Sequence, residues 1–396
     1  MHILISAVSS ARHPSGICRH AANLAKCLSG EPAVSRVTLL AGRWQVDYFR
    51  NAFGLESDAV TILAADVENN ARARNWWYYR KLPQIARGCG ADAVHLSFPA
   101  PVRRQSFSCP VICSLHDLYP YDSPRNFGYT RVLFNRIFLR QCLDASDAVI
   151  CSSDFTLSRL RQCSPRLVPQ KATRIYQTVA LDPGNGNRPG QPEIAASPFL
   201  LTVAQHRRNK NLQLLLSAFA ELRQQEESTN RLSLVIVGAE GPETANLYSL
   251  VQRLSLQQYV HFESALADIE LCRLYQECEL MIVPSSIEGF CFPVVEALRC
   301  GSRVLCSDIP VLREIGGSHC HYFSLNQEQT ALALAKAISS AMLAPAPMPF
   351  TSDRFSAKEI APQYVALYSR LAARIGATTS LQFAELDAVR HDRYAS

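Results

Sequence analysis

Two glutamates near residue 290 are spaced to bind one hydroxyl-rich ligand. Glu288 follows the apolar run 280–284 and lies in a loop, whereas Glu296 falls where the pattern predicts a helix. The second carboxylate is then about two turns further on, at 3.6 residues per turn. Carboxylates accept hydrogen bonds and loop amides donate them, so the segment could hold a polyol. A pair of solvated helix charges is the alternative.

A second candidate site follows the predicted strand 199–204. The loop carries Arg207, Arg208 and Lys210. A helix is predicted next, at 214–219. Cationic side chains and the free N–H groups of a helix N-terminus attract one anion, and a diphosphate suits this arrangement. The alternative is a solvated basic loop that binds nothing.

A histidine and an aspartate end another predicted strand, 111–115. His116 could contact a sugar hydroxyl or help to deprotonate an acceptor, because imidazole titrates near neutral pH. Asp117 could orient the histidine or serve as the base itself. A structural histidine bonded to the neighbouring backbone is the alternative, and the residue types leave these roles open.

The remaining elements predict two parallel α/β domains. Short apolar strands alternate with longer helical stretches, and a segment dense in Gly, Pro and Asn separates two sets of them. Ligands of such sheets bind beyond the carboxyl ends of the strands, so we expect the site between the domains. The predicted strands are 3–8, 37–41, 93–96, 111–115, 148–152, 199–204, 232–238, 260–262, 280–284 and 302–307. The predicted division is an N-terminal domain 1–182, a linker 183–198, a C-terminal domain 199–352, a final helix 353–374 and a tail 375–396.

Composition favours a cytoplasmic enzyme. The 396 residues carry a formal net charge of +6, which is mild for this length and selects no class of anionic partner. No apolar run approaches the roughly 20 residues that span a bilayer. The start of the chain lacks the pattern of a secretory signal. The 14 cysteines include no Cys-x2-Cys pair; we expect buried, reduced thiols and no metal site.

The segment 284–298 resembles the Glu-x7-Glu signature of glycosyltransferase family 4, whose members are retaining enzymes of the GT-B fold. The resemblance implies that Glu296 holds the ribose of a nucleotide sugar and that Lys210, with Arg207 or Arg208, neutralises its diphosphate. It also implies that the final helix crosses back to the first domain. The donor-sugar contacts implied by the signature are Glu288 and the loop Gly289, Phe290, Cys291 and Phe292.

Other positions follow the family pattern less closely. Gly16 and Arg19 match the glycine-rich turn near the donor phosphate, and His116 and Asp117 match a pair beside the transferred sugar. Cys291 stands where the family usually has glycine, whose missing side chain lets the backbone approach a ligand.

The resemblance implies a metal-independent hexosyltransferase without a cofactor, and the chain has no Asp-x-Asp pair. Mannose from GDP-mannose is the expected donor group. The expected acceptor is a lipid-linked oligosaccharide in O-antigen or exopolysaccharide assembly. The base of the donor, the acceptor and the linkage are not fixed by the sequence. A nucleotide-sugar epimerase and a non-catalytic nucleotide-sugar-binding protein are the alternatives.

The segment 72–81 mixes aromatic and cationic residues. Such a mixture suits a lipid headgroup layer, and it would make the protein peripheral on the inner face of the membrane. A partly buried helix with aromatic residues in the core is the alternative. No nucleic-acid motif accompanies the segment.

Overall fold

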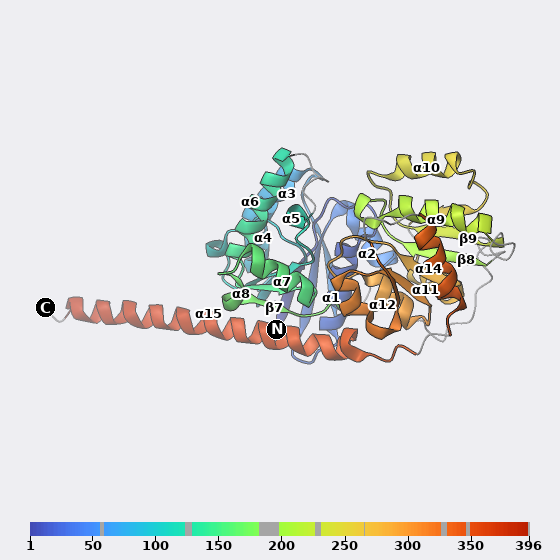
Figure 1. The fold of residues 1–396 in the computed structure, drawn as a ribbon. Helices are drawn as coiled ribbons and strands as arrows, with labels where there is room; N and C mark the ends of the chain where they lie inside the picture. The colour runs from blue at the N-terminus through green and yellow to red at the C-terminus, as the bar shows by residue number, and fades with distance from the viewer. Residues whose placement is uncertain are drawn as a thin grey trace.

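The structure is a computed structural model that describes residues 1–55, 59–122, 129–181, 198–225, 231–264, 266–325, 331–345 and 349–394. Within these ranges the chain forms two parallel-sheet α/β domains that stand side by side (Figure 1). The predicted linker 183–198 lies outside the described residues, except for its last residue.

The N-terminal domain contains a seven-stranded parallel sheet with the order β3-β2-β1-β4-β5-β6-β7. Its strands are β1 (His2–Ser6), β2 (Arg36–Gly42), β3 (Val60–Ala65), β4 (Ala93–Leu96), β5 (Val111–Leu115), β6 (Ala148–Cys151) and β7 (Ala172–Arg174). Its helices are α1 (Gly16–Ser29), α2 (Val46–Asn51), α3 (Ala71–Arg80), α4 (Leu82–Gly88), α5 (Tyr119–Asp122), α6 (Tyr129–Ala145), α7 (Asp154–Cys163) and α8 (Val168–Lys171).

The C-terminal domain contains a six-stranded parallel sheet with the order β10-β9-β8-β11-β12-β13. Its strands are β8 (Phe199–Val203), β9 (Ser233–Val237), β10 (Val260–Glu263), β11 (Leu280–Val283), β12 (Val304–Ser307) and β13 (His321–Phe323). Its helices are α9 (Leu212–Gln225), α10 (Thr244–Arg253), α11 (Asp268–Glu277), α12 (Phe292–Arg299), α13 (Pro310–Gly316) and α14 (Ala331–Leu343).

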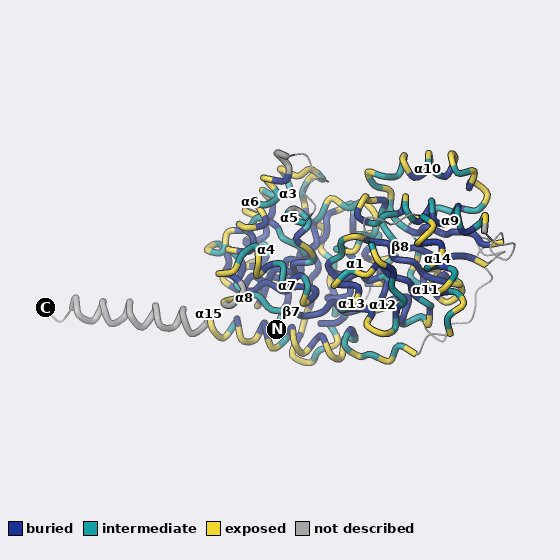
Figure 2. The backbone as a smooth tube through the Cα atoms, in the orientation of Figure 1, coloured by how far each residue is buried: buried dark blue, intermediate teal, exposed yellow. Residues whose placement is uncertain are grey.

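The central strands are buried on both faces, as parallel sheets between helical layers must be (Figure 2). Every residue of β1, β4, β5 and β6 is buried, and so is every residue of β9, β11 and β12. All 14 cysteines are free thiols, and Cys113, Cys151 and Cys306 are buried as predicted.

The last helix, α15 (Ala357–Tyr394), passes from the C-terminal domain beneath the N-terminal domain (Figure 1). It packs against α1, and its Tyr368 hydroxyl lies 2.7 Å from Nδ1 of His95 on β4. Apolar side chains at helical spacing along its first half are all buried: Ile360, Tyr364, Leu367, Tyr368 and Leu371. The predicted end of this helix at 374 is wrong, because the helical backbone continues to Tyr394.

No described helix has both the length and the apolar content that crossing a bilayer requires. The helix predicted around 72–81 is α3, and its aromatic residues divide between two environments. Trp77 and Tyr78 are buried, whereas Trp76 and Tyr79 are 57% and 38% exposed. Trp77 and Tyr78 thus agree with a helix whose aromatic residues lie in the core, and Trp76 and Tyr79 agree with an aromatic surface.

Candidate functional site

The two signatures of the C-terminal domain meet in one ion pair. Lys210 lies in a 3-10 turn between β8 and α9, and Glu288 lies in the loop between β11 and α12. The Lys210 ammonium is 2.5 Å from the Glu288 carboxylate. Burial works against the charge of Lys210, but the attraction of Glu288 outweighs it, and the pKa of Lys210 is raised. A fixed cation therefore stands beside a fixed carboxylate at the carboxyl edge of the sheet.

The second glutamate of the signature is buried in α12. Glu296 is 2% exposed, and the Tyr275 hydroxyl donates to its Oε2 at 3.0 Å. Its Oε1 accepts no hydrogen bond from the described residues. Burial raises the pKa of Glu296, and the nearby Arg19 opposes that rise. Glu296 thus accepts a hydrogen bond at one oxygen, and its other oxygen lies in an ion pair with Arg19 without a hydrogen bond.

Arg19 crosses from the N-terminal domain to this carboxylate. Its Nε lies 3.5 Å from Oε1 of Glu296, and its Nη2 lies 2.7 Å from Oδ1 of Asp268 at the start of α11. Its guanidinium also stands over the ring of Phe53, 5.3 Å from the centroid. Burial opposes the charge of Arg19, but the two carboxylates more than compensate and its pKa is raised.

Gly16 begins α1, three residues before Arg19. The Ser15 side chain caps the helix by accepting from the Cys18 N–H at 3.4 Å. A Cβ added at Gly16 would meet nothing within 4 Å. Gly16 is exposed at the start of the helix.

The two domains touch closely at Gly289. A Cβ at this position would overlap the backbone carbonyl of His116. The Ser152 hydroxyl lies 2.9 Å from the carbonyl oxygens of both Gly289 and His116, and the two oxygens share its hydrogen bond. The glycine of the signature thus serves the contact between the domains.

Cys291 has a backbone that favours glycine. Its φ of 77° lies in the left-handed region, where a side chain crowds the following carbonyl. The residue caps the N-terminus of α12 and is buried. The departure from the family's glycine therefore places a strained residue in the loop.

The aromatic residues of the loop form part of the core. Phe290 and Phe292 are buried, with ring centroids 5.4 Å apart, and Phe290 also contacts Phe355 and Tyr176. Only the backbone of these two positions is suited to contact a sugar. Their packing fixes the loop that carries Glu288.

The two arginines of the cationic loop, Arg207 and Arg208, are both exposed. The positive charge of Arg207 is among the causes that act on the pKa of Lys210. Between them, Asn209 is buried, donates to the Ile287 carbonyl at 3.1 Å and accepts from the Tyr119 hydroxyl at 3.0 Å.

His116 is held by the N-terminal domain. Its Nε2 donates to the Ser97 carbonyl at 2.6 Å, and its Nδ1 accepts from Nε2 of Gln177 at 3.1 Å. Burial lowers the pKa of His116, so the ring is neutral. Asp117 is exposed, and its Oδ1 accepts from the backbone N–H of Tyr119 at 3.0 Å.

Two more histidines lie behind His116. The Ser114 hydroxyl is 2.9 Å from Nε2 of His20 and 2.8 Å from Nε2 of His95. The His20 ring packs edge-on against His116 with centroids 4.7 Å apart. Burial above all lowers the pKa of His95, to about 3. This buried cluster connects α15, through Tyr368, to the loop at His116.

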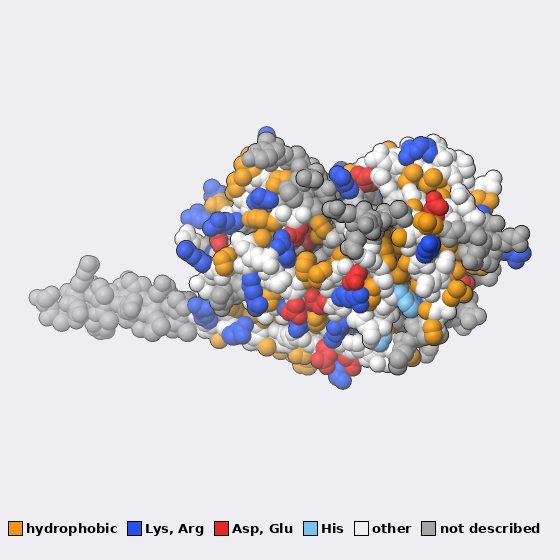
Figure 3. All heavy atoms as spheres, viewed as in Figure 1, with side chains coloured by type: hydrophobic (Ala, Val, Ile, Leu, Met, Phe, Trp, Pro, Cys, Tyr) orange, Lys and Arg blue, Asp and Glu red, His pale blue; other side chains and the backbone are white. Residues whose placement is uncertain are grey.

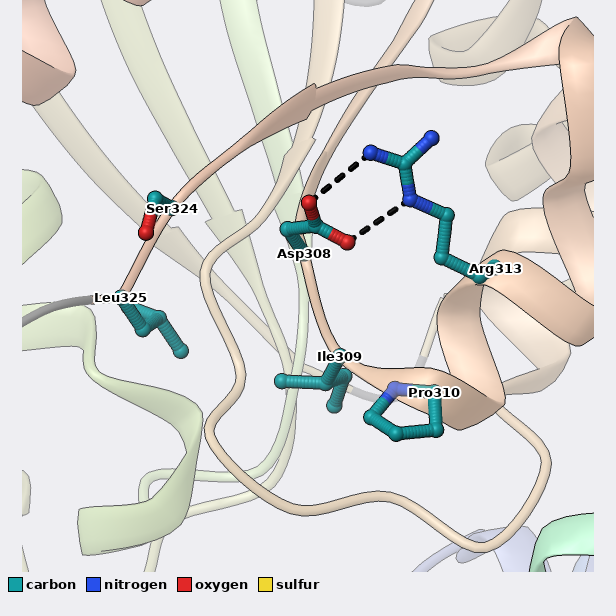
Figure 4. A pocket seen from close by; sticks show the side chains of 6 residues that line it. All are labelled: Asp308, Ile309, Pro310, Arg313, Ser324 and Leu325. Atoms are coloured by element: carbon teal, nitrogen blue, oxygen red, sulfur yellow. Dashed lines mark hydrogen bonds and ion pairs between the residues drawn. The ribbon is translucent and has the colours of Figure 1, made fainter.

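A surface hollow of about 580 Å3 lies at the outer end of the second sheet, after β12 and β13 (Figure 4). Its one ion pair among the lining residues joins Arg313 to both oxygens of Asp308, at 2.7 and 2.8 Å. Because these charges satisfy each other and none of the signature residues lines the hollow, we place the candidate site at Lys210 and Glu288 instead.

Several residues of the site were not predicted from the sequence. Asp268 and Tyr275 on α11 complete the surroundings of Arg19 and Glu296, and Tyr119 joins the two domains through Asn209. Gln177 fixes the His116 ring. Asp268 and Tyr119 each begin a helix soon after a strand ends. Many other residues hold such positions, so the sequence did not single these two out.

Two family descriptions match the chain, one for each domain. "Glycosyltransferase Family 4" matches residues 14–182, and "Glycosyl transferases group 1" matches residues 187–355. The chain belongs to glycosyltransferase family 4. The two matches together include every signature residue described above.

Curated relatives of this family member are similar over part of their length. The chain is 27% identical over 216 residues to the O-antigen chain mannosyltransferase B of Escherichia coli, covering 52% of this chain and 55% of the relative. It is 28% identical over 176 residues to the MMP alpha-(1->4)-mannosyltransferase of Mycolicibacterium hassiacum, covering 42% of each. The chain thus spans about half the length of these relatives.

Solved structures of glycosyltransferases share the fold over nearly the whole chain. WaaG, a glycosyltransferase involved in lipopolysaccharide biosynthesis, has a TM-score of 0.67 at 17% identity and covers 94% of this chain and 98% of its own. Anabaena HepE, in complex with UDP and glucose, has a TM-score of 0.61 at 18% identity and covers 97% and 100%. The predicted GT-B fold, with two facing domains and a returning helix, is confirmed.

Proposed function

We propose that this family 4 member is a retaining hexosyltransferase that moves mannose from GDP-mannose onto a glycan acceptor. The observation that carries the proposal is the Lys210–Glu288 pair, which brings the diphosphate signature and the sugar signature within 2.5 Å of each other. The names of the curated relatives, several of them mannosyltransferases, support mannose as the transferred sugar.

Lys210 and Arg207 would stabilise the leaving group. Negative charge develops on the phosphate oxygen as the glycosidic bond breaks, and preorganised cations lower the energy of that state most. We assign this role to Arg207, whose positive charge acts on the pKa of Lys210. With the chain's own cations there, the proposed reaction uses no metal and no cofactor.

Glu288 and Glu296 would bind the two ends of the donor. On donor binding, the diphosphate competes with Glu288 for Lys210, which frees the Glu288 carboxylate to accept from sugar hydroxyls. Glu296 Oε1, buried beside Arg19 without a hydrogen bond, would accept from a ribose hydroxyl. Glu296 also holds Arg19, so the donor would bind where the N-terminal domain already contacts the C-terminal one.

The acceptor would enter from the N-terminal domain. Asp117 is exposed at the carboxyl end of β5, and Gly16 is exposed at the N-terminus of α1. Both ring nitrogens of His116 contact protein groups. We therefore assign His116 a positioning role, in which its backbone carbonyl holds the Gly289 loop in place. A lipid-linked oligosaccharide on the inner face of the plasma membrane is the proposed acceptor, as in O-antigen assembly.

Transfer of labelled mannose tests the proposal. Purified protein, GDP-[14C]mannose and a lipid extract should give a labelled, organic-soluble product whose new bond keeps the α configuration of the donor, as read by NMR. An inverted product would contradict the retaining mechanism. Conversion of the donor to another sugar nucleotide without extract would support an epimerase, and binding without turnover under any acceptor would support a pure binding protein.

A further inference from the structure

Helix α6 is apolar on both of its faces. Its inner face packs into the domain through Val132, Leu139, Cys142 and Leu143, all buried. Its outer face carries large apolar side chains that are 40–59% exposed: Leu133, Phe134, Ile137 and Phe138. A surface helix normally turns polar residues outward, so an outer face of this kind indicates a partner.

The exposed apolar side chains of α6 lie among helices that are rich in basic residues. Segments 71–88 and 129–145, which form α3, α4 and α6, carry eight basic residues and one acidic residue, whereas the whole chain carries 40 and 34. Arg140 on α6 is 79% exposed, and its one acidic neighbour on the helix is Asp144. Arg80 and Lys81 are exposed beside the outward Trp76.

These helices cover the same side of the first sheet. Trp77 and Tyr78 of α3 and Leu82 of α4 share one hydrophobic core cluster with Cys142 of α6. The exposed side chains of α3 and α6 therefore belong to neighbouring parts of one layer. In the space-filling view, hydrophobic and basic side chains lie together over α4 and α6 (Figure 3).

We propose that the outer face of α6, with Trp76 and the basic residues of α3, docks on a bilayer that contains anionic lipids. Aromatic and aliphatic side chains enter the boundary between headgroups and acyl chains, and the arginines bind the anionic headgroups. A second copy of the chain is a poorer occupant, because pairing two such faces would bring two excesses of positive charge together.

The docking face lies beside the acceptor side of the proposed site. Helix α5 starts at Tyr119, two residues after Asp117, and contacts α6. A bilayer at α6 would therefore present a lipid-linked acceptor next to Asp117. The inference deepens the proposed function in this respect, but binding to vesicles requires neither donor nor acceptor.

Co-sedimentation with vesicles tests the docking face. Full-length protein should sediment with vesicles of phosphatidylcholine and phosphatidylglycerol at low salt, and less at high salt or with phosphatidylcholine alone. The double variant Phe134→Gln/Phe138→Gln should bind at least about tenfold more weakly, because two partly inserted rings are lost. Arg80→Glu/Arg140→Glu should lose at least about fivefold for each charge.

Two control variants match these changes on the other domain. Tyr248→Gln/Ile269→Gln removes side chains that are 45% and 55% exposed, and Arg253→Glu reverses an exposed charge on α10. Both should bind vesicles as the unchanged protein does. Thermal melts confirm folding of every variant, since all the altered side chains are exposed or lie at the surface.

Three results would overturn the docking face. The first is equal vesicle binding by the unchanged protein and the Phe134→Gln/Phe138→Gln variant. The second is equal binding to neutral and anionic vesicles. The third is a dimer in gel filtration that this variant abolishes while vesicle binding persists, which would make the face a self-association surface. Binding of the sugar nucleotide is measured separately by thermal shift. This measurement tests the proposed function independently of the docking face.

Discussion

Gly289 of the C-terminal domain lies directly against the backbone carbonyl of His116 in the N-terminal domain. The contact places the loop that carries Glu288 against the loop that carries Asp117. The domains are joined again by Arg19 at Glu296 and by Glu314, whose carboxylate accepts from the N–H groups of Asp154 and Phe155 at 2.7 and 3.0 Å. The candidate donor and acceptor sides thus share one framework.

Replacement of Gly289 by alanine should separate these loops. The added Cβ overlaps the His116 carbonyl, and relief of such overlap costs about 1–3 kcal/mol. We expect turnover to fall by about 100-fold, as when reacting groups are misplaced by an ångström. Gly16→Ala is the matched control for stability, because a Cβ there meets nothing within 4 Å. A melting temperature of Gly289→Ala equal to that of the unchanged protein would contradict the contact.

At position 291, glycine should give a more stable protein than alanine, the reverse of the usual order. Both Cys291→Ala and Cys291→Gly remove the thiol, but only glycine relieves the left-handed backbone with φ of 77°. We expect the glycine variant to be the more stable of the two by about 1 kcal/mol. Denaturant unfolding of the two variants measures the difference directly. A more stable alanine variant would mean that this backbone carries no strain.

The arginines at 207 and 208 should differ in their effect on nucleotide binding. The positive charge of Arg207 is among the causes that act on the pKa of Lys210. Arg207→Ala should therefore weaken GDP binding and turnover by about tenfold or more, as loss of a charge-assisted contact does. Arg208→Ala should change either by less than about threefold. Titration calorimetry with GDP compares the variants, and the opposite order would reassign the phosphate contact to Arg208.

The buried histidines should make stability fall with acid. The pKa of His95 is about 3 in the folded protein and near 6.5 when unfolded, so below pH 6.5 the unfolded state binds a proton that the folded state excludes. The linked loss for His95 alone is about 2 kcal/mol at pH 5. It begins as the pH falls below 6.5 and is complete near 3.

Denaturant unfolding between pH 7.5 and 5 measures this loss. The variant His95→Gln should have lower stability at pH 7.5 but a shallower decline with acid, because one titrating group is gone. An identical decline in His95→Gln and the unchanged protein would show that His95 does not titrate on unfolding.

The sequence predicted the central strands of both sheets and missed three at their edges. Strands 93–96 and 111–115 have the predicted bounds, because strands buried on both faces are continuous apolar runs. The missed strands, β3, β7 and β13, each have a single neighbour. These strands are less buried than the central ones: β3 exposes Thr61 and Leu63, and β7 is only partly buried throughout.

The site residues were predicted by type, but their partners were not. Loop and helix patterns located Lys210 and Glu288 separately, whereas their ion pair joins residues 78 positions apart. The contact of Arg19 with Asp268 spans 249 positions. Local periodicity carries no information on such pairs, because they depend on how two domains pack. For the same reason, the sequence did not show that Gly289 meets His116.

The most direct test of the proposed function is a thermal-shift panel of GDP-, UDP-, ADP- and dTDP-sugars with the unchanged protein, Lys210→Ala and Glu288→Ala. The account predicts selective stabilisation of the unchanged protein by GDP-mannose. Lys210→Ala should lose the response to GDP-mannose and to GDP alike, whereas Glu288→Ala should lose more of the response to GDP-mannose than to GDP. Equal losses for both ligands in Glu288→Ala, or no stabilisation of the unchanged protein by any sugar nucleotide, would contradict it.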